Sequence, residues 1–520
     1  MNHLVMAPVL LPLLGGVLLL FLPGTRLPLA RALGLALVAA QALAALALMR
    51  EVSDGATLVY AVGNWAAPFG ILLVADRLSA WMLVITALLA LFALLHAARG
   101  VDAAGRYFHV LFQWQLLGLN GAFLTGDLFN LFVFFEILLI ASYALLLHGP
   151  HGIGARERTR AGLHFVVVNL LGSSLFLFAV GTLYGVLGTL NMADLAVKAA
   201  ATPPENLGLV RAAGLLLFGV FALKAALLPF YLWLPGAYAG ASAPVAALFA
   251  IMTKVGAYSI LRVSTLIFGA EGGPVAGLIA PWLLPLALAT LAVGMLGVLA
   301  ANRLRRQIAY LVVASVGSLL AAFGLGGAAG IGAGLYYLPH STFATAALFL
   351  LADLIARRRG ALDDRLDPGP VIPGAVGLGV VFFVATVAVV GLPPLSGFLG
   401  KFMLLRAALG HTALPWIMAV VLGGGLLGLI ALARSGSLLF YRPEAEAETV
   451  GAAPPGVWDL LPVIGLLALV LGLTLWAGPI SDAATATADQ LLHPQGYIQA
   501  VLGEAPAADP GAAPGSGGNP

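Results

Sequence analysis

The sequence has no cysteine in 520 residues and few charged side chains. The first absence excludes disulfide bonds, thiolate-held iron–sulfur clusters and cysteine-ligated zinc sites. Charged residues make up 9% of the chain, whereas soluble domains carry about 25%. Because 61% of the residues are hydrophobic, the composition is typical of an integral membrane protein.

Several functional motifs are also absent. The formal net charge is only +3 and the basic residues lie in short loops, so we expect no nucleic-acid partner. The glycine-rich stretch "GLGGAAGIGAG" at 324–334 follows no predicted strand, which argues against a phosphate-binding loop. The sequence carries no dinucleotide fingerprint, nucleophile triad or metal-ligating cluster. We therefore expect no cofactor, no metal and no enzyme that acts by itself.

Long apolar runs are what the chain has in abundance. A membrane-spanning helix needs about 20 mostly apolar residues. The first run, "MNHLVMAPVLLPLLGGVLLLFLPG", lacks the basic start of a cleavable signal peptide and is interpreted as a spanning helix. We predict an all-α polytopic membrane protein with about fourteen spanning segments, at 5–22, 29–49, 70–97, 107–125, 129–147, 162–187, 209–231, 242–268, 276–300, 307–325, 331–356, 373–405, 415–441 and 457–478.

Proline predicts that two of these segments are broken. Residues 373–405 are too many for one straight helix, and Pro393 and Pro394 in "GLPPLSGFLGK" remove two backbone donors there. Pro229 and Pro235 in "KAALLPFYLWLPG" predict a second break. Residues 503–520 are rich in Pro, Gly and Ala and are predicted to be a disordered tail.

The arginines in the loops predict the orientation. Numbered from the first, the odd loops hold sixteen basic residues and the even loops hold six. Lysine and arginine concentrate in cytoplasmic loops. We therefore expect the odd loops in the cytoplasm and both termini on the outer, periplasmic side.

Four ionisable residues fall at membrane depth. Glu136 lies in the middle of "DLFNLFVFFEILLIASYALLL" (127–147), and Lys224, Lys254 and Lys401 lie in other predicted spanning segments. A charge at the centre of a spanning helix costs about 2.5–3.5 kcal/mol. Four unpaired charges would cost on the order of 10 kcal/mol, comparable to the net stability of a domain. These groups must therefore pair or line a hydrated path.

Glu136 has two interpretations. The structural one is a neutral carboxyl that is hydrogen-bonded to a neighbouring helix. The functional one is a carboxylate on a proton path, paired with a lysine. Burial disfavours the charged form of both groups and pairing favours it, so such a pair is poised between two states. Separation of the partners would let the lysine release its proton.

The three lysines differ in depth. Lys224 comes five residues before Pro229, where a helix break would leave carbonyl groups free to hold water or a cation. The alternative for Lys224 is that its ammonium group reaches an interface. Lys254 lies near the centre of its helix, too deep for that. Lys401 follows the Pro393–Pro394 break by seven residues and could lie near an aqueous end.

Histidines are the next candidates. His340 in "LYYLPHSTFATAALFLLADL" is a candidate proton relay because histidine titrates near neutral pH. The alternative is a packing histidine held by hydrogen bonds. His109 and His164 lie near predicted helix starts and are interpreted as structural.

Two acid–arginine neighbours are interpreted as helix-end ion pairs. Asp353 precedes Arg357 by one helical turn, a spacing at which the two side chains meet. Asp76 and Arg77 at the start of the third predicted helix are interpreted in the same way. Neither pair is taken as a functional site.

Five stretches together resemble the antiporter-like subunits shared by respiratory complex I and Mrp-type cation/proton antiporters. The resemblance spans about residues 60–440. Within this family, "DLFNLFVFFEILLIASYALLLHG" and "HSTFATAALFLLADLIARRRG" look most like the D subunit of the Mrp (also Pha or Mnh) antiporter. The five stretches are "GNWAAPFGILLVADRLSAWMLVIT", "GDLFNLFVFFEILLIASYALLLHG", "FALKAALLPFYLWLPGAYAGASAPVAALFAIMTKVGAYSILRV", "RLRRQIAYLVVASVG" and "GLPPLSGFLGKFMLL".

The resemblance implies fourteen helices in which helices four to eight and nine to thirteen form two inverted five-helix repeats. It places the broken helices seventh and twelfth, in agreement with the prolines. We accordingly divide the chain into helices 1–3 (1–106), a translocating core (107–441), helix 14 with its flanks (442–502) and the tail (503–520). The resemblance also implies a multi-pass protein of the bacterial inner (cell) membrane.

The family's functional residues fall on five positions of this chain. They form a polar axis along the membrane midplane that is thought to carry protons. The positions are Glu136 (helix five), Lys224 (seven), Lys254 (eight), His340 (eleven) and Lys401 (twelve). Two positions depart from complex I members: Asn302 stands where an acid is usual, and Val316 stands about where a histidine is frequent. These departures favour the Mrp type and leave helix ten without a known relay.

The leading hypothesis is a proton-translocating subunit of a multisubunit Na⁺ or K⁺/H⁺ antiporter, with the other subunits, the bilayer, protons and the cation as partners. The related alternative is a proton-pumping membrane subunit of complex I (NADH:quinone oxidoreductase) or of a membrane-bound hydrogenase. From other classes come a structural scaffold subunit, which would tolerate neutral substitution of the buried charges, and a stand-alone transporter, which would work without partners.

Overall fold

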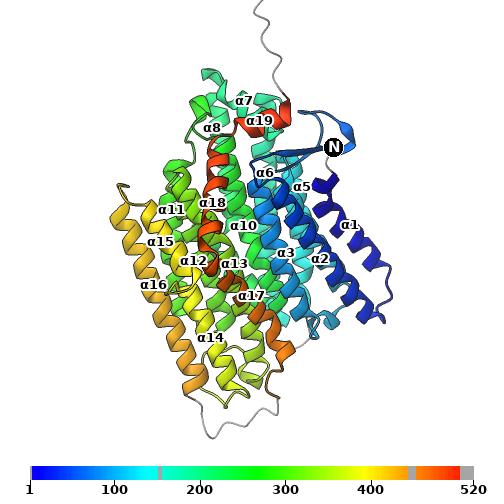
Figure 1. The fold of residues 1–520 in the computed structure, drawn as a ribbon, viewed down its shortest axis with the longest axis vertical. Coiled ribbons are helices and arrows are strands. Elements are labelled where there is room, and N and C mark those ends of the chain that lie inside the picture. The colour runs from blue at the N-terminus through cyan, green and yellow to red at the C-terminus, as the bar shows by residue number, and fades with distance from the viewer. Residues whose placement is uncertain (1–2, 150–154, 443–452, 504–520) are drawn as a thin grey trace, which may run out of the picture.

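Long helices run side by side along one common direction and form a single bundle (Figure 1). The structure is a computed structural model and describes residues 3–149, 155–442 and 453–503. In this part of the chain, 12 helices are long and apolar enough to cross a membrane. Two further predicted segments are the helix at Phe108–Leu124 and the pair of shorter helices on either side of Pro393 and Pro394. The predicted all-α membrane fold is therefore confirmed.

The helices follow one another with short connections. The N-terminal ones are α1 (Ala7–Leu20), α2 (Leu27–Glu51), α3 (Arg77–Ala97), α4 (Phe108–Leu124), α5 (Leu128–Leu147) and α6 (Ala155–Leu187). The middle ones are α7 (Met192–Ala200), α8 (Pro204–Ala225), α9 (Trp233–Gly240), α10 (Ala243–Leu266), α11 (Ala280–Ala300), α12 (Leu304–Gly324) and α13 (Gly327–Ala356). The last ones are α14 (Ala375–Val390), α15 (Ser396–Ala407), α16 (Leu414–Gly436), α17 (Val457–Leu475), α18 (Ala477–Leu492) and α19 (Gln495–Leu502).

Both predicted helix breaks are present. Helix α8 ends at Ala226, which has a left-handed backbone (φ 59°), and the chain resumes as α9 after a 3₁₀ turn at Phe230–Leu232. Helix α14 ends at Gly391 (φ 83°), and α15 begins after the two prolines. A left-handed residue after the last turn is a common way to end a helix, and proline cannot continue one.

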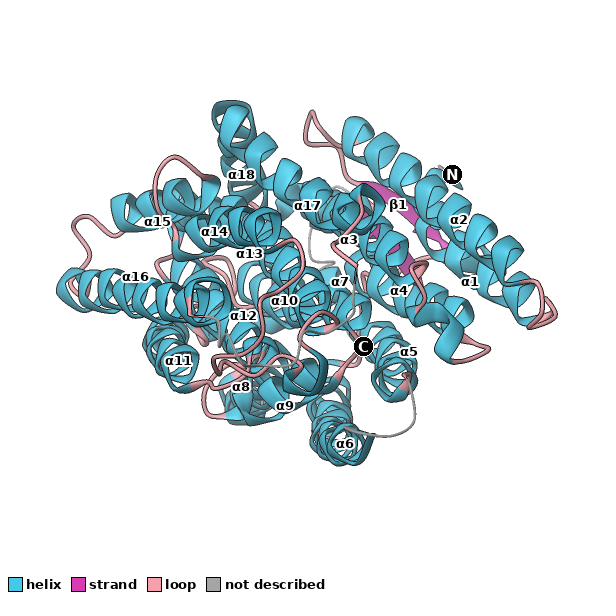
Figure 2. Cartoon of the chain, turned by 90° about the horizontal axis from the view of Figure 1, so that it is seen from below, coloured by secondary structure: helices cyan, strands magenta, loops and turns pink. Residues whose placement is uncertain are grey.

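Helices α10 and α13 form the centre of the bundle (Figure 2). Every residue in the most apolar 18-residue window of each is buried. Small residues allow the neighbouring helices to approach closely. A Cβ atom at Gly256 of α10 would lie 2.4 Å from the backbone nitrogen of Ala225, so only glycine lets α10 pack against the end of α8.

The predicted start of the helix at 70–97 was wrong. Residues Leu72–Ala75 form strand β2, which pairs antiparallel with strand β1 (Leu58–Ala61). Helix α3 begins only at Arg77, where the Asp76 carboxylate accepts a hydrogen bond from the Ser79 backbone N–H (2.9 Å). The strand is short and fully buried, so its apolar residues cannot be told from a helix turn by hydropathy alone.

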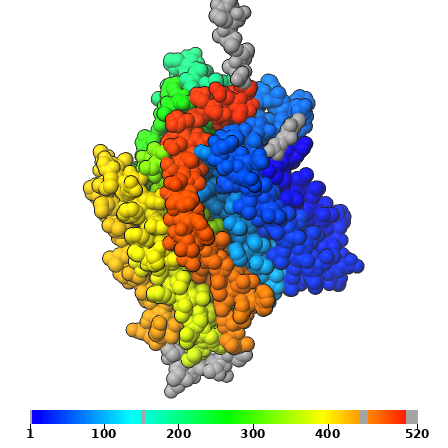
Figure 3. All heavy atoms as spheres, viewed as in Figure 1, coloured from blue at the N-terminus to red at the C-terminus, as the bar shows by residue number. Residues whose placement is uncertain are grey.

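Three helices outside the predicted spans were not foreseen. Helix α7 lies beside α19 at one end of the bundle, where the label N also lies (Figure 1). Helix α18 packs along α13 and lies on the surface between the N-terminal helices and α15–α16 (Figure 3). Of the tail predicted for 503–520, only Gly503 belongs to the described residues, so that prediction lies outside them.

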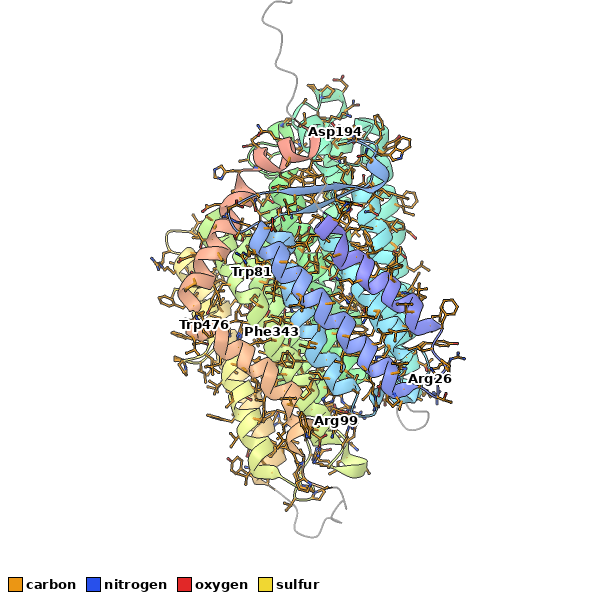
Figure 4. The ribbon with its side chains drawn as sticks, turned by 45° about the vertical axis from the view of Figure 1, so that its right-hand side comes forward. Arg26, Trp81, Arg99, Asp194, Phe343 and Trp476 are labelled. Atoms are coloured by element: carbon orange, nitrogen blue, oxygen red, sulfur yellow. The ribbon has the colours of Figure 1, made fainter. Side chains whose placement is uncertain are left out.

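The loops rich in arginine gather at one end of the molecule, which we call the arginine-rich end. Arg26 and Arg99, from two odd loops, lie at the opposite end from Asp194, from an even loop (Figure 4). Successive spanning helices run in opposite directions, so odd and even loops must lie at opposite ends of the bundle. Which end faces the cytoplasm stays a prediction.

The two predicted helix-end ion pairs had different outcomes. Asp353 and Arg357 do pair, with 2.7 Å between Oδ2 and Nη2. Asp76 does not pair with Arg77. It binds Arg262 of α10 through two hydrogen bonds, from Nη1 (2.6 Å) and Nη2 (2.8 Å). Arg262 lies near the end of the predicted segment 242–268 and is buried inside the bundle.

Candidate functional site

The five predicted site residues lie on five different helices around the centre of the bundle. Lys254 and His340 are on the two central helices and are 0% and 1% exposed. Lys224 is 7% exposed at the end of α8. Glu136 on α5 and Lys401 on α15 are half-buried.

Glu136 and Lys224 are both held by helix α6. The Ser173 hydroxyl donates a hydrogen bond to Oε1 of Glu136. The Lys224 ammonium donates one to Oδ1 of Asn169, at 3.3 Å between the heavy atoms. Asn169 and Ser173 lie one turn apart on the same face of α6. Both side chains are buried, so α6 carries a polar link between the two charged groups.

The predicted direct pair of Glu136 and Lys224 is therefore not formed. Among the described residues, no ion pair within 4.0 Å joins the two side chains. Their charges still interact electrostatically. Sequence spacing located both groups in apolar helices, but it could not show that each would bind a polar side chain of a third helix, α6.

The surroundings of Lys224 orient its partner. The Asn169 amide nitrogen donates to the Phe165 carbonyl (2.9 Å), which leaves Oδ1 as the acceptor that faces the lysine. The ammonium also lies 5.9 Å from the centroid of the Phe135 ring, in reach of a cation–π interaction. The break after α8 is fixed by Trp233, whose indole N–H donates to the Leu223 carbonyl (3.1 Å).

Lys254 has a hydroxyl as its partner. Its ammonium donates to Oγ of Ser315 on α12 (3.2 Å), and the Ser315 hydroxyl donates to the Val312 carbonyl (2.8 Å). No carboxylate in the described part of the chain lies within 4.0 Å of this ammonium. One turn further along α12, the Ser318 hydroxyl donates to the Ala314 carbonyl (3.2 Å).

His340 contacts the second helix break. Its Nδ1 lies 2.9 Å from Oγ of Ser396, the first residue of α15, and the same hydroxyl donates to the Val470 carbonyl (3.1 Å). The Tyr337 ring packs against the imidazole at 5.7 Å between centroids. A Cβ atom at position 397 would lie 2.7 Å from Nε2 of His340, so Gly397 makes the space for the imidazole.

Lys401 lies across the same break. Its ammonium donates to the carbonyl of Val390, the last residue of α14, at 2.6 Å. This carbonyl is free because the break removes the backbone donor that a continuous helix would supply. Lys401 also lines a cavity of about 320 Å³ between α14, α15 and α16, together with Gly391, Phe402 and Gly425. Lys401 and His340 are close enough for their charges to interact.

Four partners in this arrangement were missed at the sequence level: Asn169, Ser173, Ser315 and Ser396. A signal for the first two exists, because an asparagine and a serine four residues apart in "VVNLLGSSLF" define one polar face of an apolar helix. Ser315 is next to Val316, the position at which complex I members often carry a histidine. Helix α12 thus supplies a hydroxyl to Lys254 although it has no histidine there.

Comparisons with known proteins agree with this geometry. Residues 125–428 match the model of the family described as NADH:quinone oxidoreductase/Mrp antiporter, TM. The chain is 41% identical to a probable D subunit of a K(+)/H(+) antiporter from Rhizobium meliloti, over 96% of this chain and 98% of that one. It is 37% identical to the D subunit of the Na(+)/H(+) antiporter from Alkalihalophilus pseudofirmus, over 97% and 100%.

Solved structures give the same result. A chain of the Mrp complex from Dietzia sp. superposes with a TM-score of 0.86 at 31% identity, over 97% of this chain and 100% of that one. A chain of respiratory complex I from Thermus thermophilus superposes with a TM-score of 0.74 at 27% identity, over 94% and 99%. The chain therefore belongs to the NADH:quinone oxidoreductase/Mrp antiporter family of membrane subunits, and within it to the antiporter D subunits.

Proposed function

We propose that this chain carries protons through a multisubunit Na⁺ or K⁺/H⁺ antiporter, along the path Glu136, Lys224, Lys254, His340 and Lys401. The observation that supports this most is that each of the five groups is held by a polar partner on another helix or across a helix break. A purely structural charge would gain most from a tight ion pair, since an unpaired buried charge is costly. None of the three lysines has a carboxylate within 4.0 Å among the described residues.

The first step of the proposed mechanism takes place at the polar face of α6. Lys224 is held by the neutral Asn169 amide, so the negative charge of Glu136 supplies much of the stabilisation of the ammonium. When Glu136 gains a proton, that stabilisation is lost and Lys224 releases its own proton. The proton passes toward Lys254, whose helix packs directly on the end of α8 at Gly256.

The second half of the path crosses the central helices. Ser315 and Ser318 present two hydroxyls one turn apart on α12, and the first of them accepts a hydrogen bond from Lys254. Tyr337 lies against His340, and His340 meets the start of α15 at Ser396. Hydroxyl groups both donate and accept hydrogen bonds, so they can pass a proton without holding a charge. Lys401, on the free Val390 carbonyl, ends the path in this chain.

Exchange of Na⁺ or K⁺ is assigned to the assembled complex. The relatives named above are D subunits of an Na(+)/H(+) antiporter and of a probable K(+)/H(+) antiporter, and one structural match comes from an Mrp complex. We propose that this chain likewise works with partner subunits in a bacterial cell membrane, with its arginine-rich end in the cytoplasm. The matched region 125–428 falls within the proposed translocating core, 107–441.

The test is cation-dependent dissipation of a proton gradient in everted vesicles that contain the complete operon, in a host without its own antiporters. Lys224→Ala and Glu136→Ala are expected to abolish exchange while the complex still assembles. Lys198→Ala is the matched control, because this lysine lies near the end of α7 with 42% of its side chain exposed and pairs with Asp194 (2.9 Å). Full activity of both path variants would contradict the proposal and favour a structural role for the charges.

The similarity to complex I supports one alternative function, proton pumping in an oxidoreductase, which must also be tested. If the neighbouring genes encoded redox subunits, the same path would serve a proton-pumping oxidoreductase. In that case the vesicles would build a proton gradient on addition of an electron donor, without any added Na⁺ or K⁺. Cation-dependent exchange without an electron donor would exclude this alternative.

A further inference from the structure

A basic cavity opens at the arginine-rich end, between α6, α9 and the start of α12. Its volume is about 570 Å³, and none of the five proposed path residues lines it. We call it the basic cavity. Helix α9 supplies one wall, with Trp233 and two glycines, Gly236 and Gly240. The charged residues that line it are Arg160, Arg303, Arg305, Arg306, Glu157 and Asp364, and His164 lines it as well.

Its two carboxylates are already engaged. Asp364 is 3% exposed, accepts a hydrogen bond from the Arg305 backbone N–H (3.0 Å) and lies 3.8 Å from Arg303. Glu157 lies 3.9 Å from the same Arg303. Arg160 and Arg306 are exposed and have no hydrogen-bond or ion-pair partner among the described residues. The cavity therefore carries unneutralised positive charge, which attracts an anion and repels Na⁺ and K⁺.

An apolar strip continues from the cavity along α6. Leu163, Val167 and Leu170 follow Arg160 at helical spacing and are 65%, 58% and 61% exposed. The strip lies inside the predicted spanning segment 162–187, whereas Arg160 lies two residues before that segment begins, at the arginine-rich end. One helix face thus offers a positive group at the membrane boundary and apolar side chains below it. A free anion would contact only the positive group and not the apolar side chains.

We propose that the basic cavity binds the phosphate headgroup of an anionic phospholipid, whose acyl chains lie along the exposed face of α6. The guanidinium groups of Arg160 and Arg306 would contact the phosphate oxygens, since arginine is well suited to phosphate. Basic pockets between spanning helices are known places for such headgroups. Gly236 and Gly240 add no side chains to the wall that α9 forms.

The test uses the purified, assembled complex in detergent, titrated with phosphatidylglycerol and examined by native mass spectrometry. Each basic residue near a membrane surface contributes about fivefold to anionic lipid binding, so Arg160→Gln with Arg306→Gln is expected to weaken the affected site by about 25-fold. Arg156→Gln is the matched control, because Arg156 is exposed at the start of the same helix but does not line the cavity. Arg160→Lys with Arg306→Lys keeps the charge and is expected to retain most of the binding.

The outcomes separate the possible occupants. Equal phosphatidylglycerol binding by the wild-type complex and the double glutamine variant would overturn the proposal. The proposal would also be overturned if the double glutamine variant lost phosphatidylcholine binding as strongly as phosphatidylglycerol binding. Phosphatidylcholine has the same acyl chains and no net charge. If millimolar inorganic phosphate removed the difference between wild type and variant, the cavity would be a site for free phosphate and the lipid would be excluded. If the double variant does not assemble, phosphatidylglycerol binding is compared between the wild-type complex and each single variant, Arg160→Gln or Arg306→Gln.

Discussion

Glu136 and Lys224 bind two side chains of one helix, Ser173 and Asn169, that lie one turn apart on α6. The carboxylate and the ammonium are thus held in place without an ion pair between them. This arrangement leaves the ammonium dependent on a charge that protonation can remove. A direct ion pair would hold both charges more tightly and would resist the change of state that proton transfer needs.

Removal of the amide is expected to impair exchange more than stability. Asn169→Ala deletes the partner of the Lys224 ammonium, and a hydrogen bond to a charged group is worth about 1.5–3 kcal/mol. We expect the exchange rate in everted vesicles to fall on the order of tenfold or more, with the complex assembled. Ser173→Ala should have an effect of the same direction, because Glu136 loses its donor.

Ser174→Ala is the control for both changes. Ser174 is the next residue on α6, but it is exposed and its hydroxyl donates only to the Leu170 carbonyl (3.1 Å). Its removal should leave exchange unchanged. If Ser174→Ala and Ser173→Ala reduced exchange equally, the loss would reflect a general disturbance of α6 and not the polar link.

Ser396→Ala is expected to change the pH dependence of exchange. The Ser396 hydroxyl connects His340 to the Val470 carbonyl, so its loss leaves Nδ1 of a fully buried imidazole without this partner. The pH optimum should therefore shift, since the protonation of His340 depends on its hydrogen bonds. Ser341→Ala is the control, because Ser341 is also buried but donates only to the Leu338 carbonyl of its own helix. An unchanged profile in Ser396→Ala would remove His340 from the path.

Asp102 gives a prediction for acid stability. It lies in a short 3₁₀ turn (Val101–Ala104) outside the predicted spans. Burial raises the pKa of this carboxyl, but hydrogen bonds from Arg31 (2.7 Å) and His109 (3.1 Å) outweigh it and lower the pKa from 3.8 to about 2. A lowered pKa in the folded state means that the ionised carboxylate stabilises the fold above pH 3.8.

That stabilisation is lost as the pH falls from 3.8 toward about 2. Asp102→Asn should therefore lower the melting temperature of the detergent-purified complex at neutral pH, and the difference from wild type should shrink only below pH 3.8. Asp54→Asn is the control, because this acid is exposed and caps only the Ala56 backbone N–H (3.0 Å). A difference that disappeared between pH 5 and 7 would show that another group is responsible.

A structural feature could be predicted from the sequence when its physical cause lies in neighbouring residues of the chain. The breaks beside Pro229 and Pro393 were predictable because proline acts on its own backbone. The buried acid and the lysines stood out because charge is rare in apolar segments. Strand β2 was missed because four apolar residues look alike in a strand and in a helix.

The partners of the site residues could not be predicted for a different reason. Ser315 and Ser396 are small polar residues of a kind that spanning helices tolerate, and only the packing of α10, α12, α13 and α15 selects them. The Asp76–Arg262 pair shows this most clearly. The two residues are 186 positions apart, and a sequence neighbour of opposite charge, Arg77, was a plausible but wrong partner.

This pair supports the last prediction. Arg262 is 4% exposed, binds both carboxylate oxygens of Asp76, and lies between the rings of Tyr258 (5.5 Å) and Tyr497 (5.3 Å). Tyr497 belongs to α19, which packs mainly on α7, so the pair connects α19 to the end of α10 through this ring contact. Asp76→Asn leaves the buried guanidinium uncompensated, and breaking such a pair costs about 3–5 kcal/mol.

We expect Asp76→Asn to lower the melting temperature of the complex and to expose the residues after α18 to limited proteolysis. The double variant Asp76→Asn with Arg262→Gln should recover part of the loss, because it removes both charges together and leaves no buried charge unpaired. Additive losses in the double variant would show that each side chain is stabilised by other contacts. In that case the C-terminal helix would be held by packing alone, and its protection from protease should persist in both single variants.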